Sequence, residues 1–222
     1  MTIRVLLADD QALLRATFRL LIDSTTDMEV VGEAATGAEA LALCGIERVD
    51  IVLMDIRMPE LDGIEATRRI TAADDLARVK ILILTTFETE DLIVEALRAG
   101  ASAYLGKDVD PAALLDGIRK VITGDTLLSP FATRALISRV LEQPRVEALN
   151  HGAVLDRLTP RERQVLELVA LGLSNDQIAQ RLNISPTTAK THVNRTMMKL
   201  DARDRAQLVI IAYETGVVSP GD

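Results

Sequence analysis

Polar residues of a few chemically matched types follow the apolar runs in the first half of the sequence. Asp9 and Asp10 follow IRVLLA, Asp55 follows IVLM, Thr85 ends KILILT, and Lys107 comes two residues after AYL. Crowded carboxylates repel one another unless a proton or a cation joins them. Oxygen ligands suit Mg²⁺ or Mn²⁺, and an aspartate can accept a phosphoryl group as an acyl phosphate. These residues predict metal-assisted phosphoryl transfer to Asp55, provided that the fold brings them together.

The elements that would position these residues alternate between strands and helices. The strand candidates do not alternate polar with apolar residues, which indicates that helices cover both faces of a sheet. We therefore expect an α/β domain with a five-stranded, parallel, doubly wound, flavodoxin-like sheet, whose carboxyl-end loops meet in one crevice. Expected strands are 3–9, 28–34, 50–55, 80–86 and 101–105, and expected helices are 11–22, 37–44, 63–72, 90–100 and 111–122.

Residues 1–122 resemble the receiver domain of two-component response regulators. The likeness rests on the acidic pair and on the motifs LMDIRMPELDG, LTT and YLGKD, which match in both residue type and spacing. It implies that a sensor histidine kinase donates a phosphoryl group to Asp55. It also implies a Mg²⁺ (or Mn²⁺) site formed by Asp10, Asp55 and the main-chain carbonyl of Arg57, with Asp9 assisting.

The same resemblance implies how the domain responds to phosphorylation. Thr85 and Lys107 would contact the phosphoryl oxygens, and Tyr104 would be the aromatic residue that changes rotamer. Such a receiver is a phosphoacceptor that catalyses its own Mg²⁺-dependent phosphorylation and dephosphorylation, rather than a conventional enzyme. Thr86 and Gly106 depart from the family pattern, in which a smaller residue is common at the first of these positions and Leu at the second. Gly106 could loosen the loop that carries Lys107.

The net charge of −8 does not exclude nucleic acid as a partner, because the acidity is local. Residues 1–122 carry 22 acidic and 13 basic groups, whereas residues 151–222 carry 8 acidic and 9 basic groups. The sequence contains neither an apolar run of about 20 residues nor a signal-peptide pattern, so we expect a cytoplasmic protein without membrane contact. Cys44 is the only cysteine, which excludes an internal disulfide and favours simple packing in a helix.

The alternation of strands and helices stops in the second half. Residues 123–157 predict a linker that contains one helix, at 129–142, between segments punctuated by Gly and Pro. Residues 158–222 have helical spacing throughout, which predicts an all-α domain. Two of its helices are joined by a short turn, and this predicts a helix-turn-helix whose second helix enters the DNA major groove. Each of its first three helices has an expected Ser or Thr N-cap: Thr159, Ser174 and Ser185.

Polar residues share one face of the expected second helix. Thr187, Lys190, Thr191 and Asn194 follow the i, i+3, i+4, i+7 spacing of neighbours on a helix. This spacing alone fits a solvated helix face equally well. A face of small polar residues with one cation would nevertheless suit base edges and phosphates.

Residues 158–217, with the motifs LTPRERQVLELVALG and SPTTAKTHVNR, resemble the LuxR-type DNA-binding domain. Joined to a receiver, this gives the NarL/FixJ family of response regulators. The resemblance implies that Lys190, Thr191 and Asn194 face the groove of double-stranded DNA, while Thr188 and His192 help to hold the backbone or phosphates. His192 has no nearby metal-ligand partner in the sequence, so a phosphate or core contact is favoured over a metal site.

Two departures from the LuxR-type pattern concern the core of that domain. Ala189 replaces a usual Val and Thr196 a usual Ile, so the recognition helix could be held less tightly. The run from Leu208 to Ala212 is apolar on every face, which is more than a three-helix core needs. Part of this run is therefore expected to form a two-fold dimer contact that places paired recognition helices on an inverted repeat, about 34 Å apart. The residues of that expected contact are Leu208, Val209, Ile211 and Ala212.

These features together predict a phosphorylation-dependent transcription regulator. Its expected partners are a histidine kinase, double-stranded DNA, a second copy when phosphorylated, and RNA polymerase as a further candidate. One alternative is an aspartyl-phosphate phosphatase, but such an enzyme needs an acid/base aspartate two residues beyond its nucleophile, where this sequence has Arg57. A second alternative is a constitutive DNA-binding protein whose receiver serves only for protein contacts. The complete set of Asp10, Asp55 and Lys107 argues against it.

Overall fold

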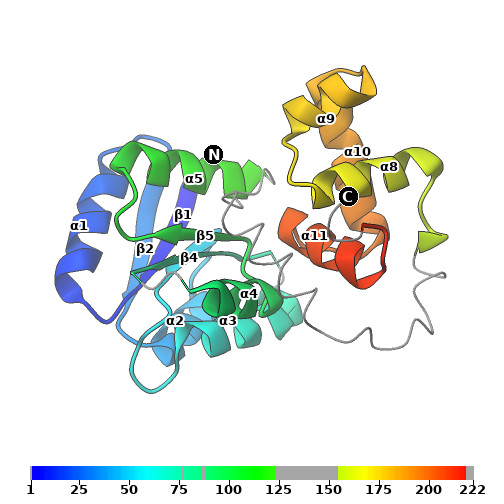
Figure 1. Cartoon of the computed structure of the whole chain (residues 1–222). Helices are drawn as coiled ribbons and strands as arrows, with labels where there is room; N and C mark the ends of the chain where they lie inside the picture. The colour runs from blue at the N-terminus through cyan, green and yellow to red at the C-terminus, as the bar shows by residue number, and fades with distance from the viewer. Residues whose placement is uncertain (1, 77, 87–88, 124–154, 219–222) are drawn as a thin grey trace. The chain divides into compact units, whose positions relative to one another are not determined.

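The computed structural model describes residues 2–76, 78–86, 89–123 and 155–218 (Figure 1). The chain divides into two compact units, 1–127 and 128–222. The first unit is an α/β domain and the described part of the second is all helical, as the sequence predicts. The helix expected at 129–142 lies outside the described residues.

The first unit is built on a five-stranded parallel sheet with the order β2-β1-β3-β4-β5. This confirms the predicted doubly wound architecture. The central strand β3 is buried along its whole length, which explains why its sequence is continuously apolar rather than alternating. The strands are β1 (Ile3–Ala8), β2 (Met28–Ala34), β3 (Ile51–Met54), β4 (Lys80–Thr85) and β5 (Ala103–Gly106).

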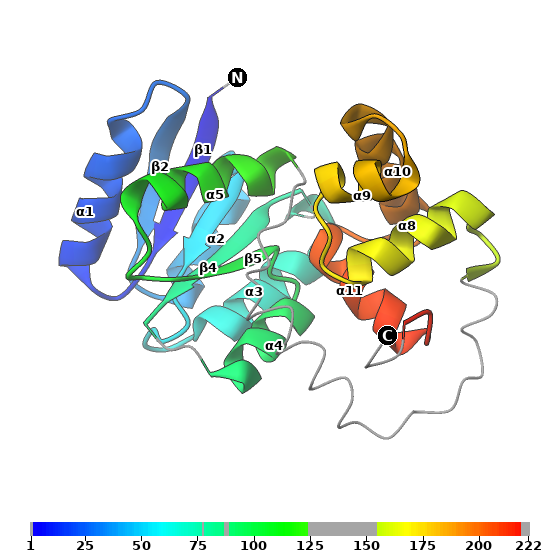
Figure 2. The ribbon, with the colours of Figure 1, turned by 45° about the horizontal axis from the view of Figure 1, so that its top comes forward.

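Five helices cover the two faces of this sheet. α1 and α5 lie on one face and α2, α3 and α4 on the other (Figures 1 and 2). The core under α1 and α5 joins Ile22 and Ile118 of these helices to Val5, Leu53 and Leu82 of three strands. The helices are α1 (Ala12–Asp23), α2 (Gly37–Ile46), α3 (Gly63–Ala72), α4 (Glu90–Arg98) and α5 (Pro111–Thr123), with a 3₁₀ turn at Asp74–Leu76. Cys44 is buried in α2 and burial raises its pKa to about 12, in agreement with a packing role.

The second unit contains α8 (Pro160–Ala170), α9 (Asn175–Leu182), α10 (Pro186–Lys199) and α11 (Arg205–Glu214). The three predicted N-caps are confirmed, because the side chains of Thr159, Ser174 and Ser185 each accept a hydrogen bond from the backbone N–H three residues later. α9 is capped at its C-terminal end by Asn183, whose left-handed conformation (φ 52°) turns the chain sharply toward α10. α10 and α11 both pack on α8, and α9 packs on α10. Among the described residues, no helix has the length and apolar character needed to cross a membrane.

Candidate functional site

Backbone hydrogen bonds continue the sheet one residue beyond the strand ends and so place the polar residues there. The N–H of Asp9 donates to the carbonyl of Ala34, and the N–H of Asp55 donates to the carbonyl of Ala8, at 3.0 and 2.8 Å. At the end of β5, the N–H of Lys107 donates to the carbonyl of Thr85 at 2.9 Å. The residues expected at one edge are therefore fixed there by the main chain.

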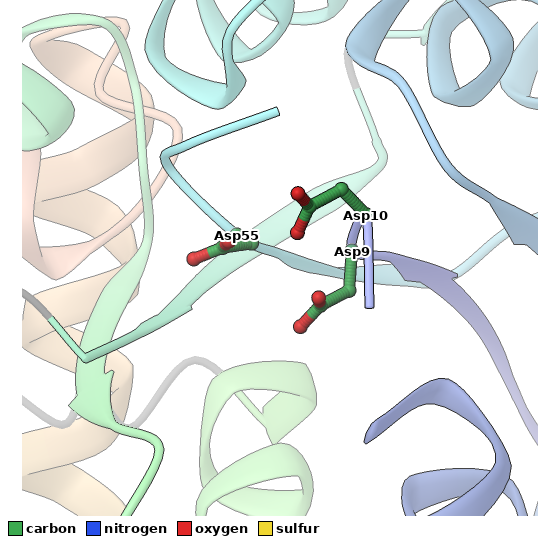
Figure 3. A group of neighbouring side chains, drawn as sticks. All are labelled: Asp9, Asp10 and Asp55. Carbon is green, nitrogen blue, oxygen red and sulfur yellow. The ribbon is translucent and has the colours of Figure 1, made fainter. Parts of the chain in front are cut away.

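Three carboxylates lie together at this edge (Figure 3). One carboxylate oxygen from each of Asp9, Asp10 and Asp55 lies within 4.8 Å of the other two. Asp9 and Asp55 are each only 5% exposed, whereas Asp10 is exposed at the rim. Mg²⁺ prefers oxygen ligands and keeps some of its bound water, so a group of carboxylates with one member facing solvent suits this ion. The convergence predicted from the strand ends is confirmed for these three residues.

Lys107 enters the same cluster and balances part of its charge. Its Nζ lies 2.6 Å from Oδ2 of Asp9 and 3.1 Å from Oδ2 of Asp55, and its side chain is 5% exposed. One ammonium thus faces two buried carboxylates, with Asp10 close by.

The pKa of Asp55 is raised above its ordinary value, chiefly by burial, while Lys107 opposes the shift and Asp9 adds to it. Within the described part of the chain, Oδ1 of Asp55 is buried and accepts no hydrogen bond. A carboxylate oxygen left in this way, in a site that carries excess negative charge, fits a cation or an incoming electrophile. The donor set therefore suits Mg²⁺ at the residues that the sequence indicated.

Two further predicted residues lie on the strands beside the cluster. Thr85 ends β4 and is completely buried, and it pairs across the ladder with Gly106 of β5. Tyr104, on β5, pairs with Ile83 and is 3% exposed. Both side chains are therefore enclosed on strands that end beside the carboxylates and Lys107.

The loop after Asp55 is held against the site by a close backbone approach. The N–H of Gly63 donates to the carbonyl of Ile56 at 2.9 Å, and Asp62 caps α3 by accepting the N–H of Glu65. A Cβ on Gly63 would lie 1.9 Å from the carbonyl oxygen of Asp55. Only glycine fits there, so the PELDG turn folds back directly onto the acceptor residue.

A hollow of about 500 Å³ opens beside Asp10. Its walls come from the β3–α3 loop and from α4, so it leads from the surface to the rim of the carboxylate cluster. The exposed side chain of Arg57 lies in its lining. The sequence predicted a crevice between the carboxyl-end loops, but not the contribution of α4, which comes from a segment remote in the chain. The lining residues are Asp10, Ile56, Arg57, Met58, Pro59, Asp62, Ile64, Leu92 and Glu95.

A second candidate site lies on α10 of the other unit. Thr187, Thr188, Thr191 and Asn194 are exposed, as expected for residues that meet DNA. Lys190 and His192 are only half-buried and stand at the flanks of this face. Arg195 and Met198, which are not among the DNA contacts expected from the sequence, are exposed on the same side, and Met198 is 76% exposed. The helical spacing of positions 187, 191, 194, 195 and 198 would have included them.

α10 is anchored to α8 through a buried carboxylate. Glu162, 4% exposed, accepts hydrogen bonds from the N–H and the hydroxyl of Thr159, both at 2.8 Å, and from Nζ of Lys199 at 2.7 Å. Burial alone would raise the pKa of Glu162, but the hydrogen bonds from Lys199 and Thr159 lower it to about 2. The last turn of α10 is thereby tied to the first turn of α8.

The family is decided by two matches that together span most of the chain. Residues 5–119 match the response regulator receiver domain, and residues 156–212 match the bacterial regulatory proteins of the luxR family. The chain belongs to the NarL/FixJ family of response regulators. It is thus a transcription regulator of the two-component type, with a receiver domain and a LuxR-type DNA-binding domain.

Similar proteins agree with this assignment over the full length of the regulator. It is 43% identical over 217 residues to the uncharacterized transcriptional regulatory protein YxjL of Bacillus subtilis, which covers 97% of both chains. It is 35% identical to the response regulator protein VraR of Staphylococcus aureus, over 98% of this chain and all of VraR. The crystal structure of a LuxR-family response regulator from Aurantimonas sp. SI85-9A1 is 36% identical, covers 64% of this chain and all of its own, and has a TM-score of 0.58.

The core of this regulator's DNA-binding domain accommodates the two unusual residues of α10. Ala189 and Thr196 are both completely buried, and the Thr196 hydroxyl donates to the carbonyl of His192 at 2.9 Å, so its polar group is satisfied inside the helix. His192 belongs to no cluster of metal ligands among the residues that the structure describes, where Asp9, Asp10 and Asp55 form the one such group.

The expected dimer contact on α11 needs a correction. Leu208, Val209 and Ala212 are 0%, 1% and 0% exposed, so these side chains have almost no surface to offer a second copy. They are buried because α11 packs against α8 and completes the core. Ile211 is half-buried and keeps accessible surface. The prediction of a dimer contact on this helix is therefore narrowed to Ile211.

Proposed function

We propose that phosphoryl transfer from a sensor histidine kinase to Asp55 switches this regulator into a form that dimerises and binds promoter DNA. The observation that carries the proposal is the buried Asp55 carboxylate, which shares Lys107 with Asp9 and has one oxygen without a hydrogen bond. An acceptor held in this way has one oxygen that no hydrogen bond among the described residues engages, and it is already linked to the cation that would respond.

The transfer step is a displacement at phosphorus. A carboxylate oxygen of Asp55 attacks the phosphorus atom of a phosphohistidine, and the new O–P bond forms as the P–N bond breaks. The leaving imidazole nitrogen keeps the bonding electron pair and takes up a proton. Mg²⁺ (or Mn²⁺), when bound, supplies positive charge next to the transferring oxygens. Asp10, Asp55 and the carbonyl of Arg57 would hold it, with Asp9 assisting.

The response begins at Lys107. A phosphoryl group on Asp55 offers Lys107 a doubly charged partner in place of the single charge of each carboxylate, and it offers Thr85 an acceptor. Shifting a two-state domain from about 1:99 to 99:1 needs roughly 5.5 kcal/mol. Charge-assisted hydrogen bonds contribute about 1.5–3 kcal/mol each. Contacts to Thr85, to Lys107 and to one backbone N–H are therefore sufficient, and the enclosed Tyr104 is the side chain through which packing would change.

The output is carried by α10. A helix that follows a tight turn and exposes small polar residues and cations fits the major groove, and a phosphorylation-dependent dimer would place two such helices on an inverted repeat. Thr187, Thr188, Lys190, Thr191, His192 and Asn194 remain the proposed contacts to DNA, now joined by Arg195. RNA polymerase is the further partner that such a bound dimer would meet at a promoter.

A direct test measures phosphorylation and DNA binding together. The full chain is incubated with Mg²⁺ and acetyl phosphate, or with the beryllofluoride mimic, beside Asp55→Ala. Asp75→Ala, which removes an exposed carboxylate from the 3₁₀ turn at Asp74–Leu76, is the matched control. We expect the parent and Asp75→Ala, but not Asp55→Ala, to gain one phosphoryl group in mass, to dimerise and to bind DNA more tightly. Equal DNA binding by all three would refute the switch.

A further inference from the structure

The outward midline of α10 is less polar than its sequence suggests. At about 100° per residue, Thr187, Thr191 and Met198 fall within roughly 40° of one another around the helix. Their side lies opposite the buried residues Ala189 and Val193. Met198 is 76% exposed, one of the few large apolar side chains of the described residues with so much surface. The residue at the centre of the helix's free face is therefore a thioether rather than a hydrogen-bonding group.

The hydroxyls of Thr191 on this midline and of Thr188 beside it are engaged within the protein. The hydroxyl of Thr191 donates to the carbonyl of Thr187 at 2.9 Å, which uses its only proton. The hydroxyl of Thr188 lies 2.8 Å from that of Ser185 in the N-cap of the helix. Thr191 consequently has no proton to donate to a base, so its γ-methyl group and the acceptor lone pairs of its oxygen are the parts of the side chain left for contact.

Charge on both sides of the midline indicates what covers it. α10 contains no acidic residue. Lys190 lies about 60° to one side of Thr187 around the helix, and Arg195 lies about 80° to the other. The exposed amide of Asn194 lies between Lys190 and Thr187. A strip of methyl and thioether groups beside one amide, between two cations, complements a groove that has base edges on its floor and phosphates along both walls. The exposed apolar feature that a major groove presents on its floor is the C5-methyl group of thymine.

We infer that Thr191 and Met198 are specificity-determining residues that recognise thymine methyl groups in the major groove. This inference rests on the proposed function, because it names what the DNA-binding face reads. The two residues are seven positions apart, about 10 Å along the helix axis, so they contact different base pairs. The preferred half-site therefore contains thymines at two separate positions, one for each side chain.

The test pairs a change in the protein with the removal of one methyl group from the DNA. Full-length, beryllofluoride-treated protein first selects sequences from a random duplex pool. Each thymine of the selected site is then replaced singly by uracil, which lacks only the C5-methyl group. For the parent we expect about a fourfold loss of affinity at two positions, the factor that corresponds to one buried methyl group. Met198→Ala should remove the loss at one of them and leave the other unchanged.

Thr191 allows a matched pair of substitutions. Thr191→Ser keeps the hydroxyl and removes the methyl group, whereas Thr191→Val keeps a methyl group and removes the hydroxyl. We expect Thr191→Ser, but not Thr191→Val, to abolish the preference for thymine over uracil at the second position. Leu171→Ala removes a partly exposed apolar side chain at the end of α8 and serves as the control for a general loss of apolar surface.

The outcomes separate this inference from the proposed function. Failure to select any sequence would overturn the proposed function and this inference with it. Selection of a defined site whose affinity does not change with uracil, or changes equally in the parent, Met198→Ala and Leu171→Ala, would overturn the inference alone. Loss of dimerisation in Met198→Ala with an intact uracil effect would assign Met198 to a protein contact and also overturn it.

Discussion

The ammonium of Lys107 lies 3.1 Å from Oδ2 of Asp55, and the same Nζ is only 2.6 Å from Oδ2 of Asp9. Lys107 is thus the internal counter-ion of the resting site as well as the proposed ligand of the phosphoryl group. A buried ion pair whose partner is removed leaves an uncompensated charge. The side chain that would report phosphorylation therefore also stabilises the receiver before phosphorylation.

Lys107→Met should destabilise the receiver by about 3–5 kcal/mol, because it leaves the buried carboxylates of Asp9 and Asp55 without their cation. Hydrogen exchange of the β3 and β4 amides in the full chain measures this loss within one domain. Added Mg²⁺ should restore more stability to this variant than to the parent, since a cation among the carboxylates replaces the missing charge.

Lys120→Met is the matched control for that experiment. Lys120 pairs with Asp116 on the surface of α5, where both side chains are about half exposed, and an exposed pair contributes at most about 1 kcal/mol. Equal protection of β3 and β4 in the two variants would contradict a structural role for Lys107.

Gly63→Ala should destabilise the receiver by about 3 kcal/mol or more and abolish phosphorylation of Asp55. The new Cβ would lie 1.9 Å from the carbonyl oxygen of Asp55, and a backbone atom cannot yield as a flexible side chain can. Thermal unfolding and the mass gain with acetyl phosphate check the two effects.

Gly45→Ala provides the contrasting glycine. Gly45 lies in α2 with no atom within 4 Å of an added Cβ, so alanine should stabilise the chain by about 0.5–1 kcal/mol. If Gly63→Ala has the same unfolding temperature as Gly45→Ala and is phosphorylated to the same extent, the loop can move away from Asp55.

The strand-end residues could be predicted from sequence because a parallel sheet places the carboxyl ends of its strands at one edge whatever its loops do. The placement of Asp9, Asp55 and Lys107 at this edge could be predicted from the strand boundaries alone. The contact of Lys107 with Asp9, by contrast, depends on rotamers and on burial, which no spacing reports. The apolar run on α11 was misread for the same reason: Leu208 is as apolar as a contact residue, but its partner is α8 of its own domain.

Glu162→Gln should destabilise the DNA-binding domain by about 1–2 kcal/mol near neutral pH, because it removes a charge-assisted hydrogen bond to Lys199. The pKa of Glu162 is lowered from 4.5 to about 2. Its contribution to stability is therefore fully present above about pH 4.5 and is lost as the pH falls toward 2. The difference between the parent and Glu162→Gln should shrink over that range, as measured by hydrogen exchange of the α8 and α10 amides.

Glu167→Gln, on the same helix, controls for the loss of an acidic group from α8. Near neutral pH, Glu167→Gln should lose less stability relative to the parent than Glu162→Gln does. A difference between the parent and Glu162→Gln that stays constant from pH 6 to pH 2 would contradict the assignment of the stabilisation to the ionised carboxylate.

Ile211→Asp should weaken the phosphorylated dimer by about tenfold while the domain stays folded, if α11 takes part in the contact. Gln207 and Ile211 of this helix and its C-cap Thr215 are half-buried, and their spacing puts them on one side. A charge at the centre of that strip would lose its hydration when a second copy packs on it, and this loss costs free energy. Sedimentation of the beryllofluoride-treated chain measures the dissociation constant.

Leu208→Asp should behave differently, because Leu208 is completely buried and a charge there cannot be accommodated without unfolding the helical core. Circular dichroism separates the two cases. If Ile211→Asp leaves the dimer constant unchanged and the domain folded, α11 has no part in pairing. The apolar excess of this helix would then be accounted for entirely by its packing on α8.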